Sequence, residues 1–180
     1  MASVLFVCLG NICRSPAGEA VFQAIVEQKA ASSGVRADEF RVDSCGTGGG
    51  SANWYKPNGF AFHEGERSDA RMTKEAKKRG YSLTSRARSL TPRDIEDFDY
   101  IICMESKNRA AVLEAAEAWG GAESRELAAQ KVKMMTSYCT KFTTATRVPD
   151  PWYEGGFDNV LDLLEDACVG LYESIIDSRS

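Results

Sequence analysis

The sequence predicts an α/β fold in which four parallel strands form a sheet with helices on both faces, a three-layer sandwich. Short apolar runs alternate with longer segments of helical periodicity, an order typical of parallel strands joined by right-handed crossovers. The 180 residues are 43% hydrophobic and contain no internal repeat or low-complexity segment. We therefore expect a single domain over residues 1–180, with enough apolar side chains for a sizeable core.

The first half of the chain supplies two strands and two helices. Residues 3–8 form an apolar run that predicts a buried first strand, and residues 17–30 follow with helical periodicity. Residues 40–44 predict the second strand, after which a glycine-rich stretch opens a long loop of the kind that often carries function. The next predicted helix starts at an Asp69 cap and ends near Gly80.

The second half completes the sheet and closes with a long helix. Residues 98–104 predict the third strand, and Ser106 caps a helix that continues to about residue 119. Residues 131–136 predict a weaker fourth strand. The periodic apolar positions of residues 157–176 predict a helix that packs on the sheet.

Composition limits the partners that we expect. The formal net charge of −4 argues against broad attraction to nucleic acid or to an anionic membrane surface. The chain has no apolar stretch of transmembrane length and no secretory signal pattern at its start, so we expect a cytoplasmic protein. Its six cysteines should then rest as thiols, and without a Cys-x-x-Cys pair we expect no structural zinc site.

The most informative motif follows the first predicted strand and reads Cys8-Leu9-Gly10-Asn11-Ile12-Cys13-Arg14-Ser15. The five-residue gap between Cys8 and Arg14 lets successive backbone N–H groups converge on one anion, while the guanidinium offers a planar fork to two oxygens. Pro16 suits the first turn of a helix whose positive N-terminus faces the same anion. We expect these eight residues to form a phosphate site with a thiol at its floor.

Several segments together resemble the low-molecular-weight protein tyrosine phosphatase family. They are Val7 to Pro16, Val42-Asp43-Ser44, Asp69 with Arg71, Phe98-Asp99-Tyr100-Ile101, and Asp150-Pro151-Trp152-Tyr153. The resemblance extends over almost the whole chain and implies a flavodoxin-like strand order 2-1-3-4. It also implies hydrolysis of phosphotyrosine in proteins or of small aryl phosphates, with inorganic phosphate as product and no metal ion or other cofactor.

The residues supply the groups that this chemistry requires. Cys8 can attack phosphorus and form a phosphocysteine, because a helix N-terminus and a nearby cation favour the reactive thiolate. Arg14 can bind two oxygens of the transferred group, and the Ser15 hydroxyl can donate to the sulfur. Asp150 can protonate the leaving oxygen and then activate water. Two plainer interpretations remain: Asp before Pro often starts a turn, and Cys8 could be an inert buried thiol.

The resemblance to this phosphatase family implies supporting roles for residues around the loop from Cys8 to Ser15. Asn11 tolerates left-handed backbone and can fix the turn of the loop together with Ser15 and Ser44. Some family members have histidine before the glycine that ends a helix, where this chain has Arg79. The expected substrate wall, which would stack on a phenyl ring, consists of Leu9, Trp54, Trp152 and Tyr153. We assign Trp119 to packing and the single histidine, His63, to a polar loop.

Cys13 adds a redox hypothesis. A reversible disulfide between Cys8 and Cys13 is geometrically plausible within one tight loop, and it would protect the nucleophile from irreversible oxidation. The alternative is that Cys13 only packs at the helix start.

Two other functions stay open: an arsenate reductase of the same fold, and a phosphotyrosine-binding module without catalysis. We expect a monomer, with a weak dimer as the alternative.

Overall fold

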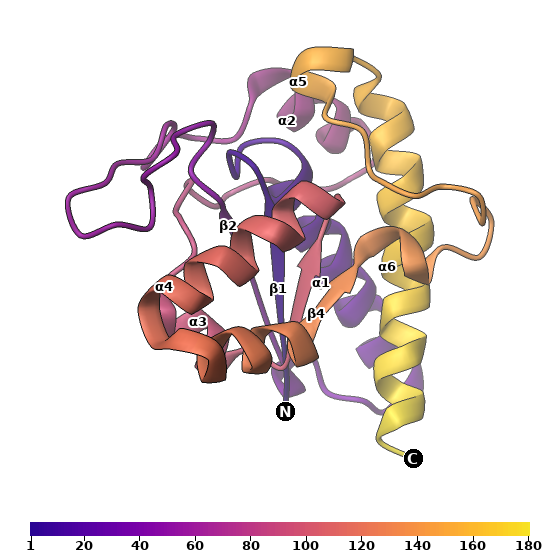
Figure 1. Ribbon diagram of the computed structural model, residues 1–180. Helices are drawn as coiled ribbons and strands as arrows, with labels where there is room; N and C mark the ends of the chain where they lie inside the picture. Colours follow the sequence, from indigo (N-terminus) through magenta and orange to yellow (C-terminus); the bar gives the residue numbers. More distant parts are fainter.

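The computed structural model describes residues 1–180, and its centre is a sheet of four strands (Figure 1). All strands are parallel, and they lie in the order β2-β1-β3-β4. Their bounds are β1 Ala2–Cys8, β2 Phe40–Gly46, β3 Tyr100–Cys103 and β4 Val132–Met134. The predicted strand order 2-1-3-4 is thereby confirmed.

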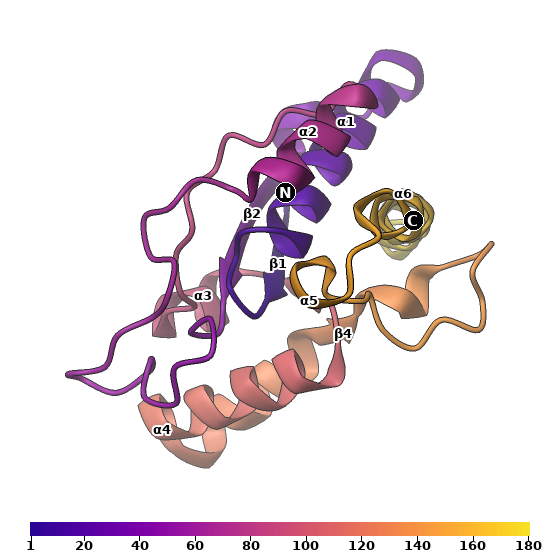
Figure 2. The same cartoon turned by 90° about the horizontal axis from the view of Figure 1, so that it is seen from above.

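The helices cover both faces of the sheet (Figure 2). One face carries α1 (Arg14–Ser33), α2 (Ala70–Lys78) and α6 (Phe157–Ser178), while α3 (Pro92–Asp97) and α4 (Ser106–Lys131) lie on the other. The short helix α5 (Pro151–Glu154) lies beyond the carboxyl ends of the strands, next to the turn that leaves β1. Two 3-10 turns, η1 (Ala37–Glu39) and η2 (Met135–Tyr138), complete the elements. None of these helices combines the length and apolarity that crossing a bilayer requires.

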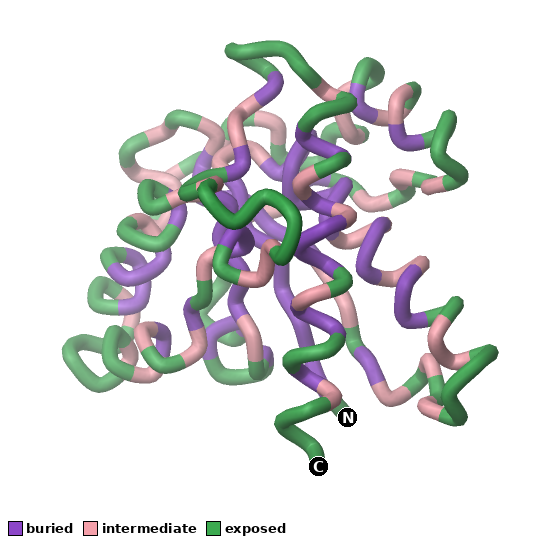
Figure 3. Tube along the Cα trace, turned by 90° about the vertical axis from the view of Figure 1, so that its right-hand side faces the viewer, coloured by how far each residue is buried: buried purple, intermediate pink, exposed green.

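Strand β1 is buried along its whole length, because apolar layers cover it on both sides (Figure 3). Val4 and Phe6 join the larger core cluster beneath α1 and α6, whereas Leu5 and Val7 join the cluster beneath α3 and α4. This alternation follows from the two-residue period of a strand. The last residue of β1, Cys8, is therefore fixed by a rigid central strand.

The differences from the predicted elements are local. Helix α1 begins at Arg14, so that Pro16 lies in its first turn as expected. The chain leaves helical geometry at Gly120 and Gly121, directly after the predicted helix end, and then resumes a second helical stretch up to Lys131. Helix α3 was not predicted, although a capping box between Thr91 and Asp94 marks its start.

Candidate active site

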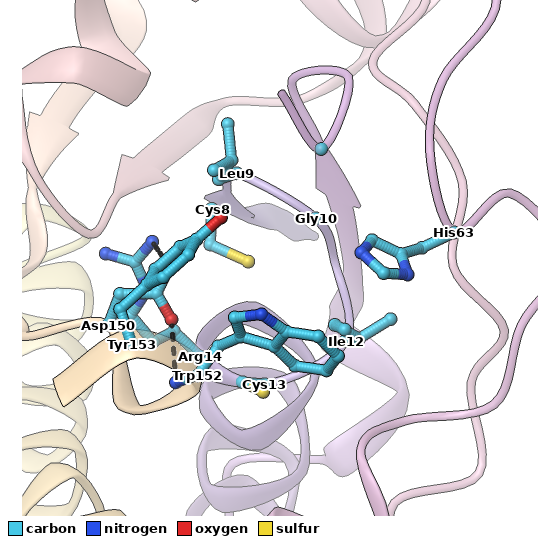
Figure 4. Close-up of a pocket in the computed structure, with 11 residues that line it drawn as sticks. Cys8, Leu9, Gly10, Ile12, Cys13, Arg14, His63, Asp150, Trp152 and Tyr153 are labelled. Carbon is cyan, nitrogen blue, oxygen red and sulfur yellow. Dashed lines mark hydrogen bonds and ion pairs between the residues drawn. The ribbon is translucent and has the colours of Figure 1, made fainter. Parts of the chain in front are cut away.

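A pocket lies at the carboxyl ends of the strands, between the turn after β1 and helix α5 (Figure 4). Ligands of open parallel sheets usually bind at this edge. The pocket brings together residues that are far apart in the sequence: Cys8, Leu9, Gly10, Ile12, Cys13, Arg14, Gly49, His63, Asp150, Trp152 and Tyr153. The predicted nucleophile, phosphate-binding arginine and general acid therefore face one cavity.

The Cys8 sulfur has two polar neighbours from its own loop. The backbone N–H of Asn11 donates to Cys8 Sγ at 3.3 Å, and Ser15 Oγ lies 3.0 Å from the same sulfur. The Ser15 hydroxyl has one proton and a second acceptor, the Cys45 carbonyl, at 3.3 Å. When the sulfur is an anion, the shorter contact to it becomes the charge-assisted hydrogen bond. The loop is thus arranged to solvate a thiolate.

Asn11 holds the loop in shape through three side-chain hydrogen bonds, two of them buried and one partly buried. Its Nδ2 donates to Ser15 Oγ at 2.8 Å and to Ser44 Oγ at 2.9 Å, and its Oδ1 accepts the backbone N–H of Arg88 at 3.0 Å. The Asn11 backbone has a φ of 56°, a left-handed conformation that asparagine tolerates better than most residues. Ser44 in turn donates to Glu19 Oε2 at 2.6 Å. Asn11 and Ser44, which we expected to act together on the loop, are thus joined by a hydrogen bond.

Glu19 is the next member of this chain of hydrogen bonds after Ser44, and sequence reasoning missed it. Burial raises the pKa of Glu19, while the hydrogen bond from Ser44 acts in the opposite direction. Glu19 lies one helical turn after Ser15 on α1, so both side chains point toward β2. The four-residue spacing between Ser15 and Glu19 was the sequence signal that could have identified Glu19.

Arg14 is 1% exposed, so its charge needs partners inside the protein. Its Nη1 donates to Glu105 at 2.8 Å and to the Val148 carbonyl at 3.1 Å, and its Nη2 donates to Asp150 Oδ2 at 3.2 Å. Its Nε makes no hydrogen bond within the protein. Of the five N–H donors of a guanidinium, Nε and one Nη2 hydrogen thus remain for two oxygens of a ligand.

The two carboxylate oxygens of Asp150 have different hydrogen-bond partners. Oδ1 accepts the backbone N–H of Trp152 at 3.1 Å and caps α5, whereas Oδ2 faces Arg14 in the pocket. Pro151 follows at the first helical position, where its missing N–H costs nothing. The Asp-Pro sequence is therefore a helix start that also directs one carboxylate oxygen to the pocket.

Comparison with known proteins agrees with this geometry. The model of the low molecular weight phosphotyrosine protein phosphatase family matches residues 3–180 of the chain. The chain belongs to this family. The phosphatase is 35% identical over 180 residues to the low molecular weight protein-tyrosine-phosphatase YfkJ of Bacillus subtilis, covering 97% of this chain and 96% of that one. It is 36% identical over 174 residues to the low molecular weight phosphotyrosine protein phosphatase of Schizosaccharomyces pombe, with 96% of each chain covered.

A solved structure supports the same assignment. The crystal structure of a protein tyrosine phosphatase from Entamoeba histolytica, with Hepes in its active site, superposes with a TM-score of 0.80. That protein is 35% identical and both chains are covered completely. Fold, family and enzyme class are therefore established: the chain is a cysteine-dependent protein tyrosine phosphatase.

The four residues of the predicted substrate wall lie around two adjoining cavities of this phosphatase. Leu9, Trp152 and Tyr153 line the pocket as expected, whereas Trp54 lines an adjoining cavity that shares Leu9, Asp150 and Tyr153 with the pocket. The Trp54 ring packs edge-on against Trp119, with 6.0 Å between ring centroids. His63 also lies in the pocket wall, 5.5 Å from the Trp152 ring.

Gly10 explains how close His63 comes to the phosphate loop. A Cβ at Gly10 would lie 3.2 Å from His63 Cδ2, so a larger residue there would press on the ring. His63 has a φ of 70° and pairs with Glu66 at 2.9 Å through Nδ1. Sequence reasoning assigned His63 to a polar loop, because nothing local shows that this loop folds back onto Gly10.

The segment from Asp69 to Arg71 fastens the phosphate loop to α2. The Asp69 N–H donates to the Ile12 carbonyl at 2.8 Å, and the Asp69 side chain caps α2 by accepting the N–H of Arg71 at 2.8 Å. The Arg71 guanidinium lies 5.3 Å from the Trp152 ring centroid. This segment therefore supports both the loop and the wall.

Arg79 has no contact with the phosphate-loop network. It donates instead to Asp162 and Glu165 of α6 and to the Asp158 carbonyl, and so joins the end of α2 to α6. The hydrogen bonds from Asn11 through Ser44 to Glu19 do not include Arg79.

Cys8 and Cys13 are the two cysteines that line the pocket. Burial raises the pKa of the Cys13 thiol, and the charge of Asp69 raises it further, so Cys13 favours the protonated form. Cys45, Cys103 and Cys168 are completely buried in the core, and Cys139 is partly exposed. No further cysteine lies in the pocket wall to carry a disulfide relay away from Cys8, which favours phosphatase over arsenate reductase chemistry.

Proposed function

We propose that this phosphatase hydrolyses phosphotyrosine through a phosphocysteine on Cys8, with Arg14 as the phosphate clamp and Asp150 as the general acid and base. The observation that carries the proposal is the common pocket of these three side chains, in which Cys8 Sγ has two hydrogen-bond neighbours and Arg14 contacts Asp150. The substrates are phosphotyrosine-containing proteins or small aryl phosphates. The aromatic mouth formed by Trp152 and Tyr153 suits a phenyl ring.

In the first step, the Cys8 thiolate attacks phosphorus in line with the aryl oxygen. The S–P bond forms as the P–O bond to the ring breaks, and the protonated Asp150 gives its proton to the departing oxygen. Arg14 Nε and the free Nη2 hydrogen bind two equatorial oxygens, while loop N–H groups bind the third.

In the second step, the Asp150 carboxylate takes a proton from water as the water oxygen attacks phosphorus. The S–P bond breaks, inorganic phosphate leaves and the thiolate returns. Ser15 donates to the sulfur as it regains its charge, over the 3.0 Å contact described above. Asn11 keeps the Ser15 oxygen oriented through the hydrogen bond from Nδ2.

Cys13 gives the pocket a redox response. Peroxide oxidises the Cys8 thiolate to a sulfenic acid, and the Cys13 thiol displaces water from it to form a disulfide. Cys13 is buried in the same loop and lines the same pocket, which supports this role. We propose the cytosol as the compartment, since the mechanism requires a reduced Cys8, and a monomer as the working state.

Steady-state turnover of p-nitrophenyl phosphate and of a phosphotyrosine peptide tests the proposal. Cys8→Ser should abolish turnover but keep phosphate binding, whereas Arg14→Ala should weaken both. Absence of turnover by the wild type, together with intact phosphate binding, would instead identify a binding module. Reduction of arsenate without phosphatase activity would support the reductase.

A further inference from the structure

A groove next to the phosphate loop carries an excess of positive charge that the proposed chemistry does not use. It lies between α2 and the antiparallel contact of residues 65–67 with residues 86–87. Its polar lining consists of four exposed cations and four hydroxyl side chains: Arg67, Lys74, Lys77, Arg86, Ser68, Thr73, Thr84 and Ser85. No acidic side chain lines this groove, although the whole chain has a net charge of −4.

None of the four cations forms an ion pair within the protein. The nearby acids are engaged elsewhere, since Glu75 binds Lys78 and Asp69 binds Arg71. The positive charge of the groove is therefore not neutralised by its surroundings.

The arrangement of these cations is unfavourable for folding alone. Arg67 and Arg86 are paired directly across an antiparallel bridge, where like charges repel. Lys74 and Lys77 are three residues apart on one face of α2, where like charges also repel. Lys77 lies in the last turn of α2 and gains from the helix dipole, but the other three residues have no such compensation.

The side chains of the groove differ in how far the protein already engages them. The Arg86 guanidinium donates one hydrogen bond to the Gly65 carbonyl at 3.2 Å. Arg67, Lys74 and Lys77 have no partner among the ion pairs or side-chain hydrogen bonds of the protein, and hydroxyl side chains lie between them in the lining of the groove. The groove therefore keeps cationic donors that an anionic ligand can engage.

The groove begins next to the catalytic pocket. Ser68 directly precedes Asp69, whose N–H binds the Ile12 carbonyl of the phosphate loop. Figure 1 shows α2 and α5 at the same end of the molecule, beyond the strands. A peptide whose phosphotyrosine enters the pocket can therefore extend along this groove.

We propose that the groove binds acidic side chains that flank the phosphotyrosine of a peptide substrate, and so sets the sequence preference of the enzyme. This inference rests on the proposed function, because it names part of the substrate of the same site. Carboxylates match the unpaired cations, and attachment to the bound phosphotyrosine holds them at a high local concentration.

The test compares phosphotyrosine peptides with Asp and Glu flanks against otherwise identical peptides with Asn and Gln flanks. Two surface ion pairs of ordinary strength correspond to about a fivefold ratio of kcat/KM in favour of the acidic peptide. The ratio should fall toward one at about 1 M salt, where the Debye length is only ~3 Å.

The double variant Arg67→Glu with Lys74→Glu should abolish or reverse the ratio. Both changes suit the folded chain, since Glu at 67 would face Arg86 and Glu at 74 would lie four residues before Lys78. Lys133→Glu, on an exposed and unpaired lysine of β4, is the control and should keep the ratio. All of these proteins should hydrolyse p-nitrophenyl phosphate equally.

Two results would overturn the inference. One is a wild-type ratio of one at low salt; the other is a ratio that survives the double variant. If the peptides show no preference but anionic vesicles bind the wild type and not the double variant, the groove recognises a membrane surface instead. Failure of the wild type to hydrolyse p-nitrophenyl phosphate would refute the proposed function, and this outcome is distinct from loss of the peptide preference.

Discussion

Replacing Asn11 with alanine should destabilise the whole phosphate loop. The side chain is 2% exposed and makes three hydrogen bonds, to Ser15, Ser44 and the Arg88 N–H. At ~1 kcal/mol each, their loss costs about 3 kcal/mol, and it leaves the Arg88 N–H without a partner. Alanine at a φ of 56° adds about 1 kcal/mol of backbone strain.

The expected total of about 4 kcal/mol corresponds to a fall in Tm of about 8–16 °C for a chain of this size. Asn11→Gly provides the matched control, because it removes the same hydrogen bonds without the strain of a Cβ. The glycine variant should recover about 1 kcal/mol, or about 2–4 °C. Both variants should lose at least about tenfold in kcat, since Ser15 is no longer oriented toward Cys8.

Calorimetry and p-nitrophenyl phosphate kinetics on the two variants provide the assay. An Asn11→Ala protein that melts within about 2 °C of the wild type would refute the reasoning, because the hydrogen bonds would then contribute little to stability. A glycine variant less stable than the alanine variant would remove the strain argument. Full activity in both variants would show that the hydrogen bonds of Asn11 do not contribute to catalysis.

Three further predictions follow from individual contacts. Asp150→Asn should slow hydrolysis of phenyl phosphate far more than that of p-nitrophenyl phosphate, and equal losses would exclude Asp150 as the acid. Cys13→Ser should make peroxide inactivation harder to reverse with dithiothreitol, and unchanged recovery would exclude the disulfide. Asp166 accepts the backbone N–H groups of residues 140–142, and these hydrogen bonds hold its pKa below the ordinary value, although burial opposes this shift. Its contribution to stability should therefore be complete above about pH 4 and decline as the pH falls through its lower folded pKa, and Asp166→Asn should remove this acid dependence in denaturant melts.

The central elements could be predicted from the sequence because their signals are local. The apolar run of β1, the motif from Cys8 to Ser15 and the periodicity of α6 each identify one element without reference to the rest of the chain. For Asp150 the local Asp-Pro pattern indicated only a turn, and the family resemblance supplied its expected role as the acid. The resemblance then supplied the strand order, which local patterns do not contain.

Other site residues depend on tertiary contacts that no local pattern encodes. His63 reaches the pocket because a long loop folds back onto Gly10. Trp54 lies in an adjoining cavity and packs against Trp119, which is far from it in the sequence. Arg88 acts through its backbone N–H, so its residue type carries no signal for that contact. Glu105 follows β3 at the edge where ligands bind, and only this position could have suggested its ion pair with Arg14.

The most direct measurement is capture of the phosphorylated enzyme during turnover. Asp150→Asn should slow the second step, so rapid denaturing quench of this variant with radiolabelled p-nitrophenyl phosphate should trap label on the protein. Peptide mapping by mass spectrometry should then locate one phosphoryl group on Cys8, and Cys8→Ser should trap none. Turnover by the wild type without any phosphoryl group on the Cys8 sulfur, under quench conditions that preserve a thiophosphate, would contradict the mechanism.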